Sequence, residues 1–86
     1  MVGHMFVVYI LKSRQYRKSY VGYTNDIERR LMEHNAGKSN FTSKYAPWDI
    51  IHKEEYLTQT EALAREKYLK SKQGRRFLKQ VFQNLQ

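Results

Sequence analysis

The sequence of this chain contains no cysteine, which rules out disulfide bonds and thiolate-bound metal as supports for its fold. A chain of 86 residues without such supports must be held together by side-chain packing. Its hydrophobic residues (41%) and aromatic residues (14%) are sufficient for one modest core. We therefore expect one domain that spans residues 1–86.

The longest apolar stretch runs from Met5 to Leu11 and is too short to cross a lipid bilayer. No cleavage site of small residues follows this stretch, so the sequence does not have the pattern of a secretory signal. We expect a cytoplasmic protein that does not have a membrane as its partner.

Basic residues outnumber acidic residues by 16 to 8, which gives a net charge of +8. The excess is concentrated after residue 64, where seven basic residues accompany a single acid, Glu66. Such a surplus favours a polyanionic partner, nucleic acid before acidic membrane. Because the charge is gathered in one part of the sequence, as a binding face requires, we expect nucleic acid as the partner, with DNA favoured.

Three segments have the pattern of β-strands. Phe6–Leu11 is a continuous apolar run rich in β-branched residues, which is typical of a buried strand. The polar segment Ser13–Lys18 has the composition of a hairpin turn, and Ser19–Thr24 follows it as a second strand. The third strand is predicted over Trp48–Leu57.

The first helix is predicted between the second and third strands. Asn25, with Glu28 three residues later, is a plausible start, and Asn35-Ala36-Gly37 is a plausible end. The segment Lys38–Pro47 has the composition of a loop, with its proline as a breaker.

Two more helices follow the third strand. Thr58-x-x-Glu61 has the form of a capping box that opens a helix running to about Lys72. Gly74 interrupts that pattern, and a basic helix with one apolar side follows over residues 74–85. Its apolar residues are Phe77, Leu78, Val81, Phe82 and Leu85. The order ββαβαα predicts the α+β class, with a small three-stranded antiparallel sheet flanked by helices.

Both of the longer helices carry polar side chains where core is expected. On the first, Arg30 and His34 lie beside the inward face that Ile27 and Leu31 mark. On the second, Glu66 lies along an apolar stripe, which is costly unless the carboxylate is paired or binds metal. Two interpretations stay open: a functional acid, and an internal salt bridge between Glu66 and Arg30.

The first two strands each contain a tyrosine near the predicted turn, Tyr9 and Tyr20. Taken alone, such residues are usually core tyrosines with a tethered hydroxyl. Gly22, inside the second strand, indicates the close approach of another backbone or a ligand.

Together these residues resemble the GIY-YIG nuclease family. The first motif of the family appears as Val7-Val8-Tyr9 and the second as Tyr20-Val21-Gly22, and the similarity runs from about Phe6 to Lys72. The family's arginine, histidine and acid correspond to Arg30, His34 and Glu66. The chain looks most like the small stand-alone, largely uncharacterised members. It is also similar to the nuclease domain of the structure-specific endonuclease that acts on branched DNA, which points to DNA repair.

The chain departs from the family pattern at three points. Val7 stands in place of the first motif's glycine, and Tyr23 stands where the repair-excision branch has a lysine. The asparagine that many members carry after the acid has no match in the basic segment Lys72–Lys79. The sequence also contains no recognition arm or extra domain, so we expect cutting directed by the structure of DNA rather than by its sequence.

The resemblance implies a metal-dependent endonuclease that hydrolyses phosphodiester bonds. One divalent ion, Mg²⁺ or Mn²⁺, would bind Glu66. Arg30 would clamp the scissile phosphate. Tyr9 would be the general base, with Tyr20 aligning the nucleophile and His34 orienting Tyr9 or shuttling its proton.

The resemblance also implies how the substrate is held. Gly22 would allow the substrate backbone to come close, and a set of basic side chains would follow the flanking phosphates. That set comprises Lys38, Lys44, Lys70, Lys72, Arg75, Arg76 and Lys79. A partner protein could supply specificity. Two alternatives stay open: a non-catalytic nucleic-acid-binding module on the same fold, and a protein-interaction domain that meets an acidic partner.

Overall fold

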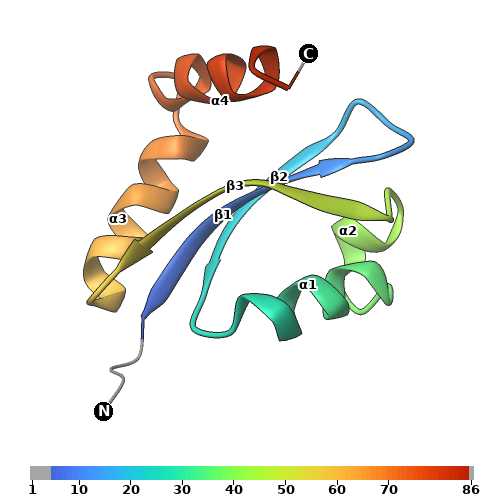
Figure 1. Ribbon diagram of the computed structural model, residues 1–86, viewed down its shortest axis with the longest axis horizontal. Helices are drawn as coiled ribbons and strands as arrows, with labels where there is room; N and C mark the ends of the chain where they lie inside the picture. Colours follow the sequence, from blue (N-terminus) through green and yellow to red (C-terminus); the bar gives the residue numbers. More distant parts are fainter. Residues whose placement is uncertain (1–4, 86) are drawn as a thin grey trace.

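The structure is a computed structural model that describes residues 5–85 (Figure 1). The predicted order ββαβαα is confirmed, with one short helix added before the third strand. The elements are β1 (Phe6–Ser13), β2 (Ser19–Thr24), α1 (Ile27–Asn35), α2 (Asn40–Ser43), β3 (Trp48–Tyr56), α3 (Gln59–Lys70) and α4 (Gly74–Gln83).

The predicted three-stranded antiparallel sheet is confirmed, and its strands lie in the order β2-β1-β3. The apolar run of β1 becomes the central strand, and Val8, Ile10 and Leu11 are fully buried. Successive side chains of a strand point to opposite faces of the sheet. Because both faces of β1 are covered, a continuous apolar run rather than an alternating one is what this strand needs.

Helices cover both faces of the sheet. On one face, Val8 and Ile10 pack with α3 and α4, to which Leu69 and Phe77 contribute. On the other face, Tyr9, Leu11 and Trp48 pack with α1 and the segment after α2. Figure 1 shows α3 and α4 together at the left and top of the view and α1 and α2 at the lower right. β2 is an edge strand, and residues of α2, α3 and α4 line one hollow beside it.

The helix ends differ slightly from the prediction. Asp26, not Asn25, caps α1, and its side chain accepts a hydrogen bond from the backbone N–H of Arg29. The predicted cap of α3 is confirmed, because Oγ1 of Thr58 accepts a hydrogen bond from the N–H of Glu61. At the starts of α1 and α3, a side chain therefore satisfies one backbone N–H that has no partner within the helix.

The C-terminal helix begins at Gly74, as predicted, and ends at Gln83, two residues before the predicted end. Gly74 lies so close to the end of α3 that a Cβ there would be 2.5 Å from Cα of Leu69. Leu85 was expected on the apolar side, but it follows α4 and is exposed.

The prediction of an unbroken loop over Lys38–Pro47 was wrong, because the segment contains α2. This single turn has no side-chain cap and no apolar periodicity that could have revealed it. It is held instead by contacts with residues outside the turn: Trp48 donates through Nε1 to the carbonyl of Thr42, and the Thr42 hydroxyl is hydrogen-bonded to His34. None of the helices described between residues 5 and 85 is long and apolar enough to span a membrane.

Candidate active site

Tyr9 lies at the centre of the sheet and is 1% exposed. It is paired across the strands with Gly22. A Cβ at position 22 would lie only 2.6 Å from the hydroxyl oxygen of Tyr9. The close approach that a glycine in this strand indicates is therefore made by Tyr9 itself. Contact of Gly22 with nucleic acid stays a prediction.

A hydrogen-bonded chain leads from Tyr9 into the interior. The hydroxyl of Tyr9 lies 3.0 Å from Nε2 of His34, and Nδ1 of His34 lies 2.8 Å from Oγ1 of Thr42. His34 and Thr42 are both fully buried. The bond between His34 and Tyr9 is the one that the orienting role requires, and Thr42 is a member of the chain that sequence reasoning missed.

Tyr20 shares the face of Tyr9, because its partner across the strands is Leu11, two residues along β1. Its ring centroid lies 6.3 Å from that of Tyr9 and 4.9 Å from that of His34. Tyr20 is half-buried, whereas Tyr9 is buried. The two motif tyrosines therefore meet around His34, with Tyr20 the more accessible of the pair.

Arg30 reaches the same group from α1, with its side chain 32% exposed. Its Nη1 donates to Oε1 of Glu33 at 2.9 Å, and this bond raises the pKa of Arg30. The expected alternative of a salt bridge with Glu66 is not formed: Arg30 pairs with Glu33, one turn along its own helix. The guanidinium stays close enough to the Tyr9 phenol to act on its ionisation.

Glu66 extends from α3 and is 15% exposed. Its Oε2 accepts a hydrogen bond from Nζ of Lys70 at 3.3 Å, and this ammonium lies 5.8 Å from the centre of the Tyr20 ring. The partner of Glu66 is therefore Lys70 rather than Arg30. Glu66 and Lys70 belong to α3, which covers the sheet face opposite to that of Tyr9. Their side chains reach the motif residues at the edge strand β2, where Lys70 lies near Tyr20.

Burial sets the ionisation of the hydrogen-bonded pair. Burial raises the pKa of Tyr9 to about 12, and the nearby Tyr20 adds to this, while Arg30 acts in the opposite direction. Burial, helped by the positive charge of Arg30, lowers the pKa of His34 to about 4. At neutral pH both side chains are uncharged, so Tyr9 and His34 are joined by a neutral hydrogen bond rather than by an ion pair.

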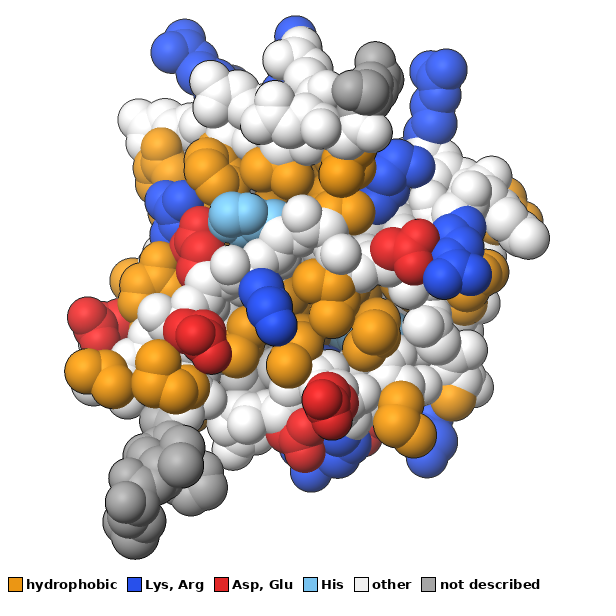
Figure 2. Space-filling model, in the orientation of Figure 1, with side chains coloured by type: hydrophobic (Ala, Val, Ile, Leu, Met, Phe, Trp, Pro, Cys, Tyr) orange, Lys and Arg blue, Asp and Glu red, His pale blue; other side chains and the backbone are white. Residues whose placement is uncertain are grey.

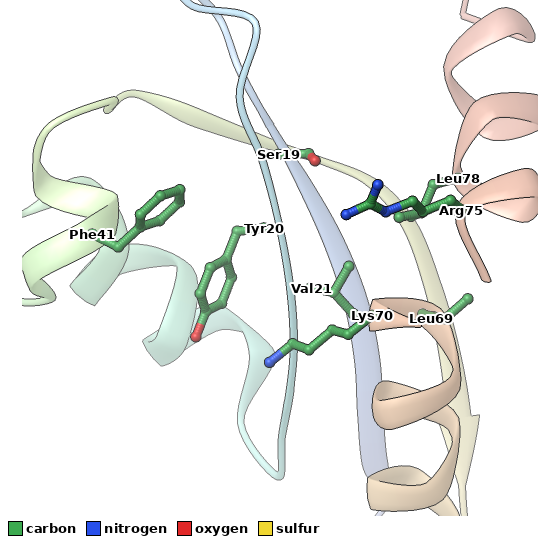
Figure 3. A pocket seen from close by; sticks show the side chains of 8 residues that line it. All are labelled: Ser19, Tyr20, Val21, Phe41, Leu69, Lys70, Arg75 and Leu78. Atoms are coloured by element: carbon green, nitrogen blue, oxygen red, sulfur yellow. The ribbon is translucent and has the colours of Figure 1, made fainter. Parts of the chain in front are cut away.

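An open hollow of about 350 Å³ adjoins Tyr20 between β2, α2 and the α3–α4 junction. Figure 3 shows Tyr20 and Phe41 on one side of it and Lys70 and Arg75 reaching in from the helices on the other. Its lining residues are Ser19, Tyr20, Val21, Phe41, Leu69, Lys70, Arg75 and Leu78. Cationic and aromatic side chains thus face each other across a space next to the motif residues.

The basic residues predicted to follow phosphates are all exposed but do not gather at one place. Lys70 and Arg75 line the hollow beside Tyr20. Lys72 and Arg76 line a different hollow with Tyr68, and Lys38 lies beside α1. Lys44 directly follows α2, and Lys79 is exposed on α4. In Figure 2, acidic and basic side chains are mixed over the sheet, and basic ones project around the top of the view.

Sequence reasoning missed a second group of basic residues in and next to the β1–β2 turn. Lys12, Arg17 and Lys18 line a hollow that shares Ser19 with the one beside Tyr20. Only the polar, basic composition of the turn pointed to them, and a hairpin turn has that composition for conformational reasons as well.

A single carboxylate of this region, that of Glu66, is available to a metal ion that a substrate phosphate would also bind. Within residues 5–85, no three His, Cys, Asp or Glu side chains lie together in a way that would hold a metal. Mg²⁺ does not require such a cage, since it keeps several waters and is bound by one or two carboxylates together with substrate phosphates. Lys70 contacts Oε2 of Glu66, and no hydrogen bond among the described residues uses Oε1. Glu66 therefore has one carboxylate oxygen with which it could bind an ion.

Comparison with known proteins identifies the family. The family model described as the GIY-YIG catalytic domain matches residues 5–80. A UPF0213 protein of Haloquadratum walsbyi is 45% identical over 53 residues, 60% of each chain. A UPF0213 protein of Staphylococcus epidermidis is 35% identical over 86% of this chain and 90% of its own. The solution NMR structure of a UPF0213 protein from Bacillus halodurans superposes with a TM-score of 0.54 at 28% identity, covering 90% of this chain and 84% of that one.

Proposed function

Because this chain belongs to the GIY-YIG family, we propose that it is a metal-dependent endonuclease that hydrolyses phosphodiester bonds in DNA. The observation that carries the proposal is the hydrogen bond between Tyr9 and His34, placed beside Tyr20 and Arg30. Hydrolysis of a phosphodiester needs an activated water, neutralised charge on the phosphoryl group and a stabilised leaving oxygen. The residues around Tyr9 include a candidate side chain for each of these three requirements.

Tyr9 and His34 form the path for the proton of the attacking water. With the pKa of Tyr9 near 12 and that of His34 near 4, the phenol enters the reaction protonated and the imidazole neutral. As water attacks phosphorus, its proton passes to the Tyr9 oxygen while the Tyr9 proton passes to Nε2 of His34. The new P–O bond forms as the bond to the leaving oxygen breaks. Tyr9 is thus regenerated at once, and His34 carries the proton away as an imidazolium.

Thr42 and Tyr20 position this pair. Nδ1 of His34 lies against the Thr42 hydroxyl, which keeps Nε2 directed at Tyr9. Tyr20 is the more accessible tyrosine and lines the hollow, so its hydroxyl is suited to align the water.

Positive charge for the phosphate comes from three side chains. Arg30 lies beside Tyr9, and Lys70 and Arg75 line the hollow. A planar guanidinium binds two phosphate oxygens at once, which fixes the phosphorus relative to the water. Glu66 would hold one ion, Mg²⁺ or Mn²⁺, which when bound supplies further positive charge beside the phosphate and the leaving oxygen.

The selectivity that we propose follows the structure of DNA rather than its sequence. Lysine and arginine side chains around the hollow suit contacts with phosphates, and such contacts carry no sequence information. An open hollow of about 350 Å³ beside an edge strand suits a locally exposed phosphate.

A second candidate function is a nucleic-acid-binding module that does not cut. The observation in its favour is the 1% exposure of Tyr9, which limits the access of water to the proposed base. Incubation of labelled branched, single-stranded and duplex DNA with Mg²⁺, Mn²⁺ or EDTA separates the two. We expect metal-dependent cutting of branched DNA by the wild type and none by Arg30→Ala prepared in parallel. Tight binding by a wild-type protein that never cuts would establish the second function instead.

A further inference from the structure

Four aromatic side chains form a row that leads from the candidate active site to the β1–β2 turn. Successive ring centroids lie 6.2 Å apart for Tyr20 and Phe41, 5.3 Å for Phe41 and Tyr45, and 5.4 Å for Tyr45 and Tyr16. These residues come from β2, α2, the segment after α2 and the turn. We refer to Tyr20, Phe41, Tyr45 and Tyr16 as the aromatic row.

The row is open to solvent along much of its length. Phe41 is 43% exposed and Tyr16 is 48% exposed, while Tyr20 and Tyr45 are half-buried. Figure 3 shows Phe41 beside Tyr20 at the hollow next to β2. Large apolar side chains that gather at the surface mark binding sites more often than isolated ones do. The row therefore extends the candidate active site without a break.

Positive charge accompanies the row. Nζ of Lys18 lies 5.2 Å from the centre of the Tyr45 ring, and Lys44 is the exposed neighbour of Tyr45 in the chain. Arg17, next to Tyr16, is also exposed. Asp49 does not oppose this charge, because two nitrogens of Arg14 already bind its carboxylate. Cations interleaved with exposed aromatic rings are the combination that unpaired nucleic acid requires, because each nucleotide presents one phosphate and one flat base.

We propose that the aromatic row binds the unpaired bases of a DNA strand that continues from the phosphate held at the candidate active site. The inference rests on the proposed function and narrows its substrate to DNA with a single-stranded flank beside the cut. Bases of a duplex are stacked on each other and hide their faces, whereas an unpaired strand can place each base against a ring. Lys18 and Lys44 then bind the phosphates between those bases.

The test measures binding in EDTA, so it does not depend on cutting. A blunt fluorescein-labelled hairpin is compared with hairpins that carry an unpaired tail of roughly six nucleotides, within the usual range of single-strand site sizes, on the 5′ or the 3′ end. Fluorescence anisotropy gives the affinity of each. We expect one tail to increase the affinity of the wild type at least about tenfold, since loss of stacking typically weakens binding about 5- to 150-fold per base.

Two variants remove parts of the row at little structural cost. Tyr16→Ala acts at an exposed residue, and Phe41→Leu keeps an apolar side chain beside Trp48. We expect each variant to lose most of the gain from the tail, and Tyr16→Ala, which lies outside the hollow, to keep the wild-type affinity for the blunt hairpin. Tyr68→Ala is the matched control, because Tyr68 is a tyrosine of α3 with a similar exposure of 42%.

The inference is overturned if neither tail raises the affinity of the wild type, or if Tyr68→Ala removes the gain as fully as Tyr16→Ala. Melting temperatures verify that the variants are folded. The outcome is separate from that of the proposed function. A protein that binds tails through the row but never cuts supports the inference alone, and one that cuts DNA without any effect of a tail refutes it alone.

Discussion

Tyr9 and Gly22 are paired across β1 and β2, and the Tyr9 phenol occupies the space that any side chain at position 22 would need. A Cβ there would meet both the hydroxyl oxygen of Tyr9, at 2.6 Å, and its Cζ atom, at 2.8 Å. The glycine of the second motif therefore leaves the space that the tyrosine of the first motif occupies. The Tyr9 hydroxyl can reach His34 because residue 22 of β2 has no side chain in its way.

Gly22→Ala should displace the Tyr9 ring and destabilise the protein. Overpacking of a buried site typically costs about 1–3 kcal/mol. Chemical denaturation measures the loss, and Tyr9→Leu provides the matched background because leucine ends short of the phenol hydroxyl. In that background Gly22→Ala should cost clearly less. Equal costs in both backgrounds would show that the strain lies in the backbone of β2 and not against Tyr9.

Tyr9→Phe should cut DNA about 10²- to 10⁴-fold more slowly than the wild type, the usual loss when a general base is removed. It should still fold, at a cost of about 1–3 kcal/mol, because Nε2 of His34 loses its buried partner. Tyr20→Phe should lose far less, since a neutral aligning hydrogen bond is worth about 0.5–1.5 kcal/mol. Single-turnover cleavage is the measurement. A larger loss in Tyr20→Phe would transfer the role of base to Tyr20.

The pH dependence of the same assay adds a second check. Because the proton relay needs Tyr9 protonated and His34 neutral, the wild-type rate should stay level with pH between the pKa of His34, about 4, and that of Tyr9, about 12. A rate that rises steadily through this range, with no such rise in Tyr9→Phe, would instead make an ionised Tyr9 the base.

Glu66→Gln should abolish metal-dependent cutting and leave binding to DNA nearly intact. Its effect on stability should be small, because the pair that it breaks is an i,i+4 contact with Lys70, and such pairs contribute about 0.3–0.5 kcal/mol. Cleavage and melting temperature are measured together, and Lys70→Gln, which breaks the same pair from the other side, is the control for the melting temperature. A large drop in melting temperature in Glu66→Gln alone would point to a structural role for the acid.

Acid should destabilise the protein through His34. The pKa of His34 falls from 6.5 to about 4 on folding. Between these two pH values the unfolded chain therefore binds a proton at His34 and the folded chain does not. The stability linked to this group is complete above pH 6.5 and is lost as the pH falls towards 4, with a slope approaching about 1.4 kcal/mol per pH unit. Denaturation of the wild type and of His34→Gln across this range tests it. The gap between the two should shrink on acidification, and parallel curves would contradict the buried neutral imidazole.

Both Arg75 and Arg76 should contribute to the salt dependence of DNA binding, whereas only Arg75 should also affect the rate of cutting. Each phosphate contact contributes about 0.9 to the slope of log affinity against log salt, so replacing both by alanine should flatten the slope by up to about two units. Only Arg75 lines the hollow beside Tyr20, so Arg75→Ala alone should also slow cutting. Lys53→Ala, on the exposed side of β3, is the control. An unchanged slope would place the binding face elsewhere, with Lys12, Arg17 and Lys18 as the next candidates.

Features that depend on local patterns could be predicted from the sequence. The β-branched run of β1, the composition of the turn and the cap at Thr58 each act over a few residues, and the structure has the corresponding elements in the predicted order. The residue types of the two motifs, with Arg30, His34 and Glu66, were enough to identify the family. Their individual roles stay predictions.

The tertiary structure alone decided which atoms these residues meet. α2 could not be foreseen, because its turn is stabilised by Trp48 and His34 rather than by a cap or a periodicity of its own. The sequence could not show the partners of Glu66 and Arg30, because each charge has a possible partner one turn away on its own helix as well as the other charge on another helix.

The shift in the ionisation of Tyr9 has the same origin. A positive charge beside a tyrosine favours its ionisation, but burial in the centre of the sheet outweighs the charge of Arg30 and raises the pKa of Tyr9 to about 12. Burial depends on every element that packs around a residue, and residues distant in the sequence supply those elements. For this reason the sequence determined which strands and helices form and which chemical groups the site contains. Only the packing of α1, α2 and α3 around β1 and β2 decided which of those groups are neutral, which are paired and which face solvent.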